Sequence, residues 1–517
     1  MAKDIKEVSQ NIPETALNSG KTFVNVKTSG QTLTAEKGSL LSDVLRSCGI
    51  APDMPCGGRG TCKKCAVKVS GKICLACQTK IEHDIDVETL NAQILSAAPA
   101  AVTAKKTKLT GNSMFTKYGL AADLGTTTIC VSLSVREPTK NEERIYETFR
   151  KNPQAAFGAD VISRLDAANR MIANGEAEKL AVGAVSAINE MTLKLCGQIG
   201  ILPEEIDAAV ITGNTAMLYL LTGKNPKSLI ASPFIADSLF GEYLSACELN
   251  LVISKNARVY LPRCISAFAG ADIITAILAS GMTEKPETSL LADIGTNGEI
   301  ALQRHGEIFC ASASAGPAFE GSSLSCGSYA VAGAINKVFL KDGKIKYETI
   351  GGGAASGICA SAVIDTLAVM LRLGIMDKTG FISETYKFTD GVFLTLKDIR
   401  QIQLAKGAIR AGIETLLETA GVKWADICAF YIAGGFGSYL NLNNAAAIGL
   451  IPPEILPAAL RCAKLYPPGN LALAGAQMIL REKSLAAKTE EIAKRAKTVQ
   501  LSANPVFEEN FMKYISF

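Results

Sequence analysis

The sequence concentrates thiol groups in one short segment, because five of its fifteen cysteines lie between residues 56 and 77. Thiolates bind soft or borderline metals and iron–sulfur clusters, and a cluster needs backbone amides that point at its sulfur atoms. Three glycines between the first two of these cysteines allow the main chain to wrap closely around such a group. The pattern therefore predicts a [2Fe–2S] site. Its predicted iron ligands are Cys56, Cys62, Cys65 and Cys77.

Other uses of these cysteines stay open. Cys74 is an alternative fourth ligand, although the Leu-Ala-Cys-Gln context favours Cys77. A structural zinc ion held by Cys62, Cys65, Cys74 and Cys77 is a second alternative. Its eight-residue spacer is shorter than is usual for a zinc ribbon, and zinc leaves Cys56 and the glycines without a purpose. Free thiols are a third alternative.

A second candidate site is an Asp-x-Gly-Thr turn that occurs twice, in residues 120–128 and again 170 residues later in 290–298. Glycine frees backbone N–H groups to cradle a phosphate, and threonine hydroxyls add further donors. An aspartate at the end of the strand supplies the hard oxygen that Mg²⁺ prefers. No Walker-type GxxxxGK[ST] sequence occurs anywhere in the chain. The residues predicted to handle phosphate and Mg²⁺ are Asp123, Gly125, Thr126, Thr127, Asp293, Gly295, Thr296 and Asn297.

A third glycine motif, Ile-Ala-Gly-Gly-Phe-Gly-Ser, occupies residues 432–438. Glycines that follow an apolar strand let the backbone approach a flat ring and a ribose. A structural strand-to-helix turn is the alternative. Under the first interpretation the predicted adenosine contacts are Gly434, Gly435 and Gly437.

Three acidic or hydroxyl residues near the second turn are further candidates. We predict that Glu299 orients the water that attacks a phosphate, with an ordinary strand-face carboxylate as the alternative. Ser314 and Glu320 lie on a glycine-flanked loop after the second phosphate strand. We predict that these two residues face a protein partner.

The elements that must position the cysteines are predicted within residues 20–95. Strands 23–26 and 32–34 flank a glycine-containing turn and predict a hairpin. Ser39 opens a short helical pattern that Gly49 ends, and residues 80–87 alternate like a closing strand. The predicted order is therefore hairpin, helix, cysteine loop and strand.

The rest of the chain divides by composition. Residues 1–19 are predicted to be a flexible tail, and residues 96–117, rich in Ala, Lys, Ser and Thr, a linker that tethers two working parts. From residue 118 onward apolar strands alternate with alanine-rich helices. Since each copy of the repeated turn begins a similar pattern, we predict two lobes of similar fold, 118–285 and 286–517.

Composition excludes several classes of protein. A net charge of +4 gives no reason to expect a nucleic-acid or membrane-surface binder, and two histidines make His-based triads improbable. Residues 1–20 carry three acidic side chains and lack the apolar core of an export signal. Charged residues interrupt the longest apolar stretch, 357–376, so a membrane span is not expected. The expected location is the cytoplasm.

The N-terminal part resembles a known family. A hairpin, a helix, the sequence PCGGRGTCKKC and then LACQT before a final strand resemble the β-grasp fold of plant- and adrenodoxin-type ferredoxins. These ferredoxins place the last ligand much further along the chain. Only eleven residues separate Cys65 from Cys77 here, so the intervening hairpin must be trimmed.

The remainder resembles the actin/Hsp70/sugar-kinase (ASKHA) ATPases, whose two RNase H-like lobes close around Mg-ATP. The order turn, turn, glycine loop carries this resemblance. Five further segments, joined to the ferredoxin-like part, make the chain similar to the reductive activators of corrinoid-dependent enzymes. These segments are 152–154, 158–164, 213–217, 316–321 and 357–359.

The resemblance implies a function. Such activators use ATP to return an inactive Co(II) corrinoid to the Co(I) state needed for methyl transfer, with electrons carried by the [2Fe–2S] centre. The implied partners are a corrinoid protein and an upstream low-potential electron donor, and homodimers are common in the family. Rival functions are an ATP-driven electron donor to a radical dehydratase, a small-molecule kinase, and a non-catalytic module with a zinc-braced N-terminal domain.

Overall fold

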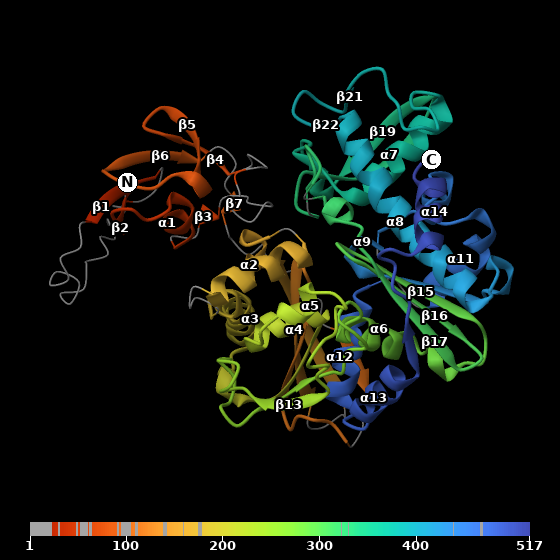
Figure 1. The fold of residues 1–517 in the computed structure, drawn as a ribbon, viewed down its shortest axis with the longest axis horizontal. Helices are drawn as coiled ribbons and strands as arrows, with labels where there is room; N and C mark the ends of the chain where they lie inside the picture. The colour runs from red at the N-terminus through yellow and green to blue at the C-terminus, as the bar shows by residue number, and fades with distance from the viewer. Residues whose placement is uncertain are drawn as a thin grey trace. The chain divides into compact units, whose positions relative to one another are not determined.

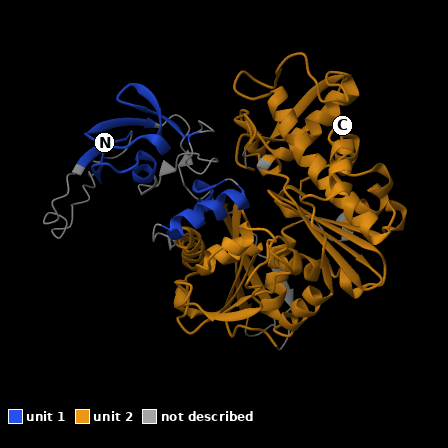
Figure 2. Cartoon of the chain, viewed as in Figure 1, with its two compact units in different colours: residues 1–97, 153–174 blue, residues 98–152, 175–517 orange. Residues whose placement is uncertain are grey.

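The computed structural model divides the chain into two compact units (Figure 2), which are described separately. The N-terminal unit comprises Met1–Ala97 and Pro153–Asn174, and the C-terminal unit comprises Ala98–Asn152 and Gly175–Phe517. The residues described are 23–28, 32–47, 50–51, 60, 65–89, 93–94, 105–108, 112–137, 142–158, 160–173, 178–321, 323–328, 330–437, 439–465 and 469–517. Within them, no helix combines the length and the apolar character that crossing a membrane requires.

A five-stranded sheet in the order β2-β1-β6-β4-β5 forms the N-terminal unit (Figure 1). Strands β1 and β2 form the predicted antiparallel hairpin, and the last strand, β6, pairs parallel to β1. Alternation buries Val24 and Val26 against Leu41 and Leu45 of α1, as a half-buried sheet requires. The predicted hairpin, helix and closing strand are confirmed, although the strand begins at Ile85 rather than at residue 80. The elements are β1 Phe23–Lys27, β2 Thr32–Glu36, α1 Leu41–Ser47, β3 Ile50–Ala51, β4 Ala66–Val69, β5 Lys72–Leu75, η2 Ala76–Gln78, β6 Ile85–Thr89, β7 Gln93–Ile94, η3 Pro153–Ala156 and α2 Val161–Ala173.

The C-terminal unit contains two sheets built on one plan. In the first, β9, β10 and β11 form an antiparallel meander and β12 lies parallel to β9. In the second, β15, β16 and β17 form the same meander and β23 lies parallel to β15. The prediction of two lobes of similar fold is confirmed in this repeated topology. The strands are β8 Lys105–Lys108, β9 Tyr118–Leu124, β10 Thr128–Glu137, β11 Glu142–Lys151, β12 Ile206–Gly213, β13 Glu242–Ser245, β14 Arg258–Leu261, β15 Ser289–Ile294, β16 Gly298–Arg304, β17 Glu307–Ala313, β18 Ala334–Lys341, β19 Lys344–Thr349, β20 Gly357–Ile358, β21 Tyr386–Lys387, β22 Phe393–Leu394, β23 Ala429–Ala433 and β24 Ala496–Thr498.

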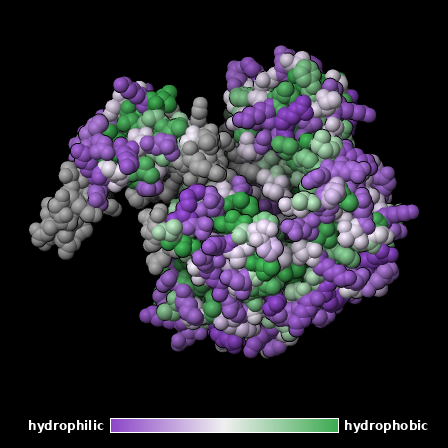
Figure 3. Space-filling view, viewed as in Figure 1, coloured by the Kyte–Doolittle hydropathy of each residue, from purple (hydrophilic) through white to green (hydrophobic). Residues whose placement is uncertain are grey.

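Helices cover these sheets, and a shared core joins them. Tyr260 and Ile277 of the first half belong to one buried cluster with Leu291, Cys310 and Leu480. Figure 3 shows hydrophilic side chains along the outer edge of this unit, with hydrophobic ones interspersed on the visible face. The helices are α3 Glu178–Ile199, α4 Thr215–Thr222, α5 Lys227–Ile230, α6 Ala271–Ser280, α7 Ala360–Leu373, α8 Leu396–Ala420, α9 Gly434–Gly437, α10 Leu442–Ala447, α11 Leu456–Leu465, α12 Leu471–Arg481, α13 Leu485–Arg495 and α14 Pro505–Tyr514.

The prediction that residues 96–117 form a linker differs from the structure in the second half of this segment. Residues Lys105–Lys108 form the edge strand β8, which pairs antiparallel with β11. Phe115 is buried, and the N–H of Met114 donates to the carbonyl of Leu480 at 2.9 Å. Because an edge strand is held by backbone hydrogen bonds, its sequence need not contain apolar residues. A polar, lysine-rich sequence therefore looked like a tether.

Helices α6 and α12 cross at very short range, although they lie about 200 residues apart in the chain. A Cβ atom at Gly475 would lie 2.0 Å from the carbonyl oxygen of Thr275. Glycine is therefore required at this crossing, because any side chain would separate the two helices.

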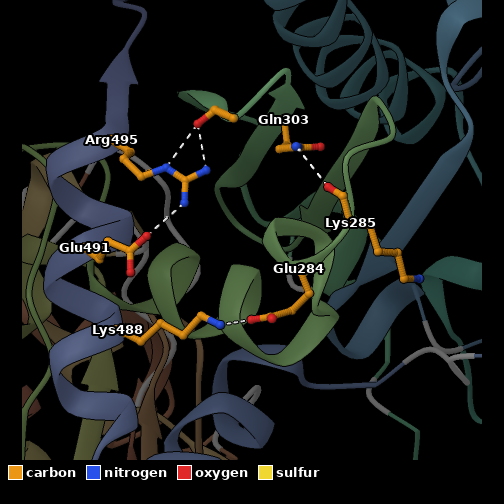
Figure 4. Close-up of polar contacts among 7 residues, drawn as sticks. Glu284, Lys285, Gln303, Lys488, Glu491 and Arg495 are labelled. Carbon is orange, nitrogen blue, oxygen red and sulfur yellow. Dashed lines mark hydrogen bonds and ion pairs between the residues drawn. The ribbon is translucent and has the colours of Figure 1, made fainter.

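Helix α13 ties the end of the first lobe to the second sheet (Figure 4). Lys488 forms an ion pair with Glu284, which follows α6. The guanidinium group of Arg495 donates to the carbonyl of Gly306 at 2.7 and 3.0 Å, in the turn between β16 and β17. These contacts fix both lobes to one C-terminal helix.

Lys406 of α8 is buried, and its Nζ donates to the carbonyl of Ser516. Burial lowers the pKa of this amine to about 7. Between pH 7 and the unfolded pKa near 10.5 the unfolded chain binds more protons, so stability rises with pH. Lys406→Met is therefore expected to raise Tm by about 3 °C at pH 6. The gain is expected to shrink toward pH 10.

Thermal unfolding monitored by circular dichroism between pH 6 and 10 measures this difference. Lys397→Met, an exposed lysine on the same helix, is the matched control and should leave Tm unchanged at every pH. A Lys406→Met variant that is less stable than the parent at pH 6 would contradict the assigned cost of burying the charge.

Candidate functional site

Two of the predicted iron ligands lie side by side in the N-terminal unit. The Sγ atoms of Cys65 and Cys77 are 3.3 Å apart, and both residues are buried and free of disulfides. Cys65 directly precedes β4, and Cys77 lies in η2, whose first residue, Ala76, donates its N–H to the carbonyl of Cys65. Two short backbone elements therefore place the two thiols together. Cys56 and Cys62 lie outside the described residues.

The surroundings of the cysteine pair fit an iron–sulfur centre. The amide Nε2 of Gln78 lies 3.7 Å from the Sγ of Cys77, at hydrogen-bonding distance for sulfur. Gly60 has a φ of +74°, and a Cβ there would lie 3.2 Å from the side chain of Gln78. The positive φ favours glycine at this position, beside the side chain of Gln78. Cys74, the alternative ligand, lies within β5 opposite Val67.

The first phosphate turn, between β9 and β10, is held by two asparagines. The side-chain amide of Asn152, which is completely buried, donates to the carbonyl of Gly125 at 2.9 Å. The amide of Asn214 donates to Oγ1 of Thr126 at 3.0 Å. These asparagines fix the shape of the turn, and both lie in segments that the sequence analysis singled out only by resemblance.

The second turn lies directly opposite the first. The hydroxyl groups of Thr127 and Thr296 are 2.6 Å apart and share a hydrogen bond, although 169 residues separate them. The N–H of Gly295 donates to the carbonyl of Asn297 at 3.0 Å, which closes the second turn. The two copies of the repeated turn therefore face each other.

Glu320 contacts the second phosphate turn, which the sequence did not predict. Its Oε1 accepts hydrogen bonds from the N–H of Thr296 at 2.8 Å and from the hydroxyl of Thr296 at 2.7 Å. The cause is topological, since β17 lies beside β16 and its following loop returns to the β15–β16 turn. The role of Glu320 toward a partner stays a prediction. Ser314 is exposed, and its role toward a partner stays a prediction.

Four carboxyl groups from both lobes gather beside the turns. Burial, with repulsion from neighbouring carboxylates, raises the pKa of Asp272 to about 7 and of Asp293 to about 8. Burial raises the pKa of Asp123 to about 6 and the pKa of Glu299 well above its usual range. A concentration of buried negative charge is unfavourable alone and suits a divalent cation with oxygen ligands.

Sequence reasoning missed two of the polar groups in this site. Asp272 lies in the first turn of α6 behind Gly270, where a Cβ would lie 2.3 Å from the Cα of Asn214. Asn470, the N-cap of α12, donates its side-chain amide to Oδ2 of Asp123 at 2.6 Å. An Asp or Asn at the start of an apolar helix could have indicated these two residues. The same pattern is equally typical of an ordinary helix N-terminus.

The glycine motif places α9 against the end of β15. Gly434 has a φ of +89°, and a Cβ there would lie 2.6 Å from Oδ1 of Asp293. Gly437 packs against Ile432. Close packing therefore explains why glycine occupies both Gly434 and Gly437. A Cβ at Gly435 would meet no atom within 4 Å, so packing does not explain that glycine.

Three family models match this chain in succession. A 2Fe-2S iron-sulfur cluster binding domain matches residues 24–88, the RACo middle region matches 118–285, and the C-terminal domain of RACo, the ASKHA domain, matches 287–517. A solved structure described as a reductive activator for corrinoid, iron-sulfur protein is 27% identical, with a TM-score of 0.69, over 96% of this chain and 98% of that chain. The chain belongs to the reductive activators of corrinoid-dependent enzymes.

Two curated proteins are similar to this family member over most of its length. The corrinoid activation enzyme RamQ of Eubacterium limosum is 28% identical over 93% of this chain and 96% of its own length. A [Co(II) methylated amine-specific corrinoid protein] reductase of Methanosarcina barkeri is 29% identical over 77% of each chain. The ferredoxin-like and ASKHA parts expected from the sequence are thus both confirmed for this activator.

Proposed function

We propose that this chain uses ATP to drive the one-electron reduction of a Co(II) corrinoid in a partner protein to Co(I). The observation that carries the proposal is the union, in one chain, of a 2Fe-2S domain with the middle and ASKHA domains of the activator family. The relatives described as corrinoid activation enzyme and corrinoid protein reductase support the same reaction class.

The cysteine loop binds the group that carries the electron. A [2Fe–2S] cluster bound by Cys56, Cys62, Cys65 and Cys77 supplies a one-electron carrier. Burial of Cys65 and Cys77 excludes water from their thiols, and the amide of Gln78 is placed to donate toward the sulfur of Cys77. Such donors raise the reduction potential of a thiolate-bound centre, so Gln78 tunes the electron transfer.

The two turns bind the phosphates of the nucleotide and its Mg²⁺ ion. Thr126, Thr127 and Thr296 present hydroxyl groups and backbone amides to the phosphates, as turns of this kind do. Asp123 and Asp293 hold Mg²⁺ directly or through water, and Asn470 orients the carboxylate of Asp123. In this proposal Asn297 completes the second turn, Gly295 keeps it close to Glu320, and Gly435 leaves room for adenosine.

ATP is required because the cobalt couple has a low potential. For a one-electron transfer, every 59 mV or so of uphill potential costs about tenfold in equilibrium. Nucleotide binding across two lobes changes which conformer is favoured, and that change drives the transfer only if the conformers differ in affinity for the corrinoid state. The proposal includes a low-potential upstream donor, a homodimeric assembly and a cytoplasmic location.

The test is an anaerobic assay of the full chain reduced with Ti(III) citrate and mixed with a Co(II) corrinoid protein. We expect the absorbance of Co(I) to appear with Mg-ATP and to stay at the background level without nucleotide. Equal cobalt reduction in both samples would contradict the proposal. Transfer of the γ-phosphate to a sugar in place of cobalt reduction would favour the kinase alternative.

A further inference from the structure

The second phosphate turn already carries an anionic ligand from its own chain. Oε1 of Glu320 accepts from both the backbone N–H and the hydroxyl of Thr296, at 2.8 and 2.7 Å. Thr296 is buried, so water does not compete freely for these two donors. A carboxylate oxygen on a backbone N–H is the same kind of charge-assisted contact that a phosphate oxygen makes. Glu320 and a nucleotide phosphate therefore require the same donors.

The contact is only partly satisfied, which favours exchange. Oε2 of Glu320 is buried and has no hydrogen-bond partner among the described residues. Leaving one oxygen of a buried carboxylate without a partner costs free energy. Asp293 lies near enough to interact unfavourably with the charge of Glu320. Glu320 therefore holds the two Thr296 donors through one oxygen only, while its other oxygen gains no hydrogen bond from this position.

The backbone around Glu320 permits its displacement. Residues Pro317–Glu320 form a single 3₁₀ turn between Gly316 and Gly321, which have φ values of +73° and +76°. Glycine adopts these positive φ values without the strain that a side chain would add, and it has more backbone conformations open to it than other residues. The neighbouring residue Phe319 stacks on Phe436 of α9, with ring centroids 4.6 Å apart. Movement of Glu320 therefore shifts a ring that packs on the glycine motif.

We propose that Glu320 is an internal competitor of the nucleotide phosphate, and that phosphate binding displaces it from Thr296 and moves the Phe319–Phe436 pair. The inference rests on the proposed ATP-dependent function and adds regulation of that same site. Nucleotide affinity is lower than the turns alone allow. Occupation of the phosphate turn is transmitted to the glycine motif by one four-residue segment.

Two variants separate displacement from simple charge repulsion. Glu320→Gln keeps the shape of the side chain and removes its charge, which weakens the bond to Thr296. Glu320→Asp keeps the charge, but it is one methylene shorter and no longer reaches Thr296. We expect both variants to bind ADP and a non-hydrolysable ATP analogue about tenfold more tightly than the parent, by calorimetry on the full chain. The affinity for adenosine should not change, because adenosine has no phosphate.

Glu307→Gln, an exposed glutamate of β17, is the matched control and should bind like the parent. Tighter binding in Glu320→Gln alone would reduce the effect to charge repulsion and overturn the inference. Weaker binding in both variants, or unchanged affinity with lost hydrolysis, would also overturn it and make Glu320 a ligand or catalytic group. A parent protein that binds no nucleotide would instead refute the proposed function.

Discussion

Replacing Cys77 with serine is expected to remove most of the visible absorbance of anaerobically purified protein and at least half of its bound iron. Cys77 lies 3.3 Å from Cys65 in a buried pair, and a hydroxyl is a poor substitute for a thiolate as a ligand of iron–sulfur centres. Cobalt reduction should fall to the background of the assay. Iron analysis and the visible spectrum measure the first effect, and Co(I) absorbance measures the second.

Cys74→Ser is the matched control, because Cys74 lies only three residues away on β5. It should keep the absorbance and the iron content of the parent. Loss of colour in Cys74→Ser with retention in Cys77→Ser would identify Cys74 as the fourth ligand. Zinc without iron in the parent protein would favour the structural zinc alternative.

Asp293→Asn should lower ATP hydrolysis, and with it ATP-dependent cobalt reduction, about 100-fold or more, while the iron content stays constant. Asp293 is the penultimate residue of β15, beside the second turn, and adjoins Gly434 of the glycine motif. The substitution replaces one carboxylate oxygen with an amide nitrogen and removes the negative charge that holds Mg²⁺ at the proposed site. Phosphate release at saturating Mg-ATP measures the loss.

The same variant should be more stable than the parent in EDTA, since it removes a carboxyl group whose ionisation is opposed by burial and, to a lesser extent, by neighbouring carboxylates. Asp390→Asn, an exposed aspartate of the same lobe, should change neither hydrolysis nor Tm. Full hydrolysis in Asp293→Asn would exclude Asp293 from metal and phosphate handling. Loss of iron in that variant would indicate unfolding in place of a catalytic effect.

Sequence reasoning located the groups that act through short-range spacing. Eleven residues separate Cys65 from Cys77, and the two cysteines flank the paired strands β4 and β5 of one small sheet. The repeated turns were recognisable because each contains its own glycine and threonines. Their meeting through Thr127 and Thr296 followed from the internal repeat, since two similar lobes place equivalent turns at equivalent positions.

The remaining site residues depend on long-range packing. Asp272 and Asn470 enter the site only because α6 and α12 cross at Gly475. The contact of Glu320 with Thr296 was not predicted, because no local pattern shows that a loop after β17 returns to the second turn. The strand β8 was missed because its partner, β11, supplies the backbone bonds and its own lysines resemble a solvated tether.

The crossing of α6 and α12 also limits how these two helices are able to move. With the two backbones in contact at Thr275 and Gly475, neither helix can translate toward the other. Asp272 and Asn470 lie only three and five residues from that contact. A rotation of the helices about it therefore displaces both polar groups by little, while the distant ends of the helices travel further.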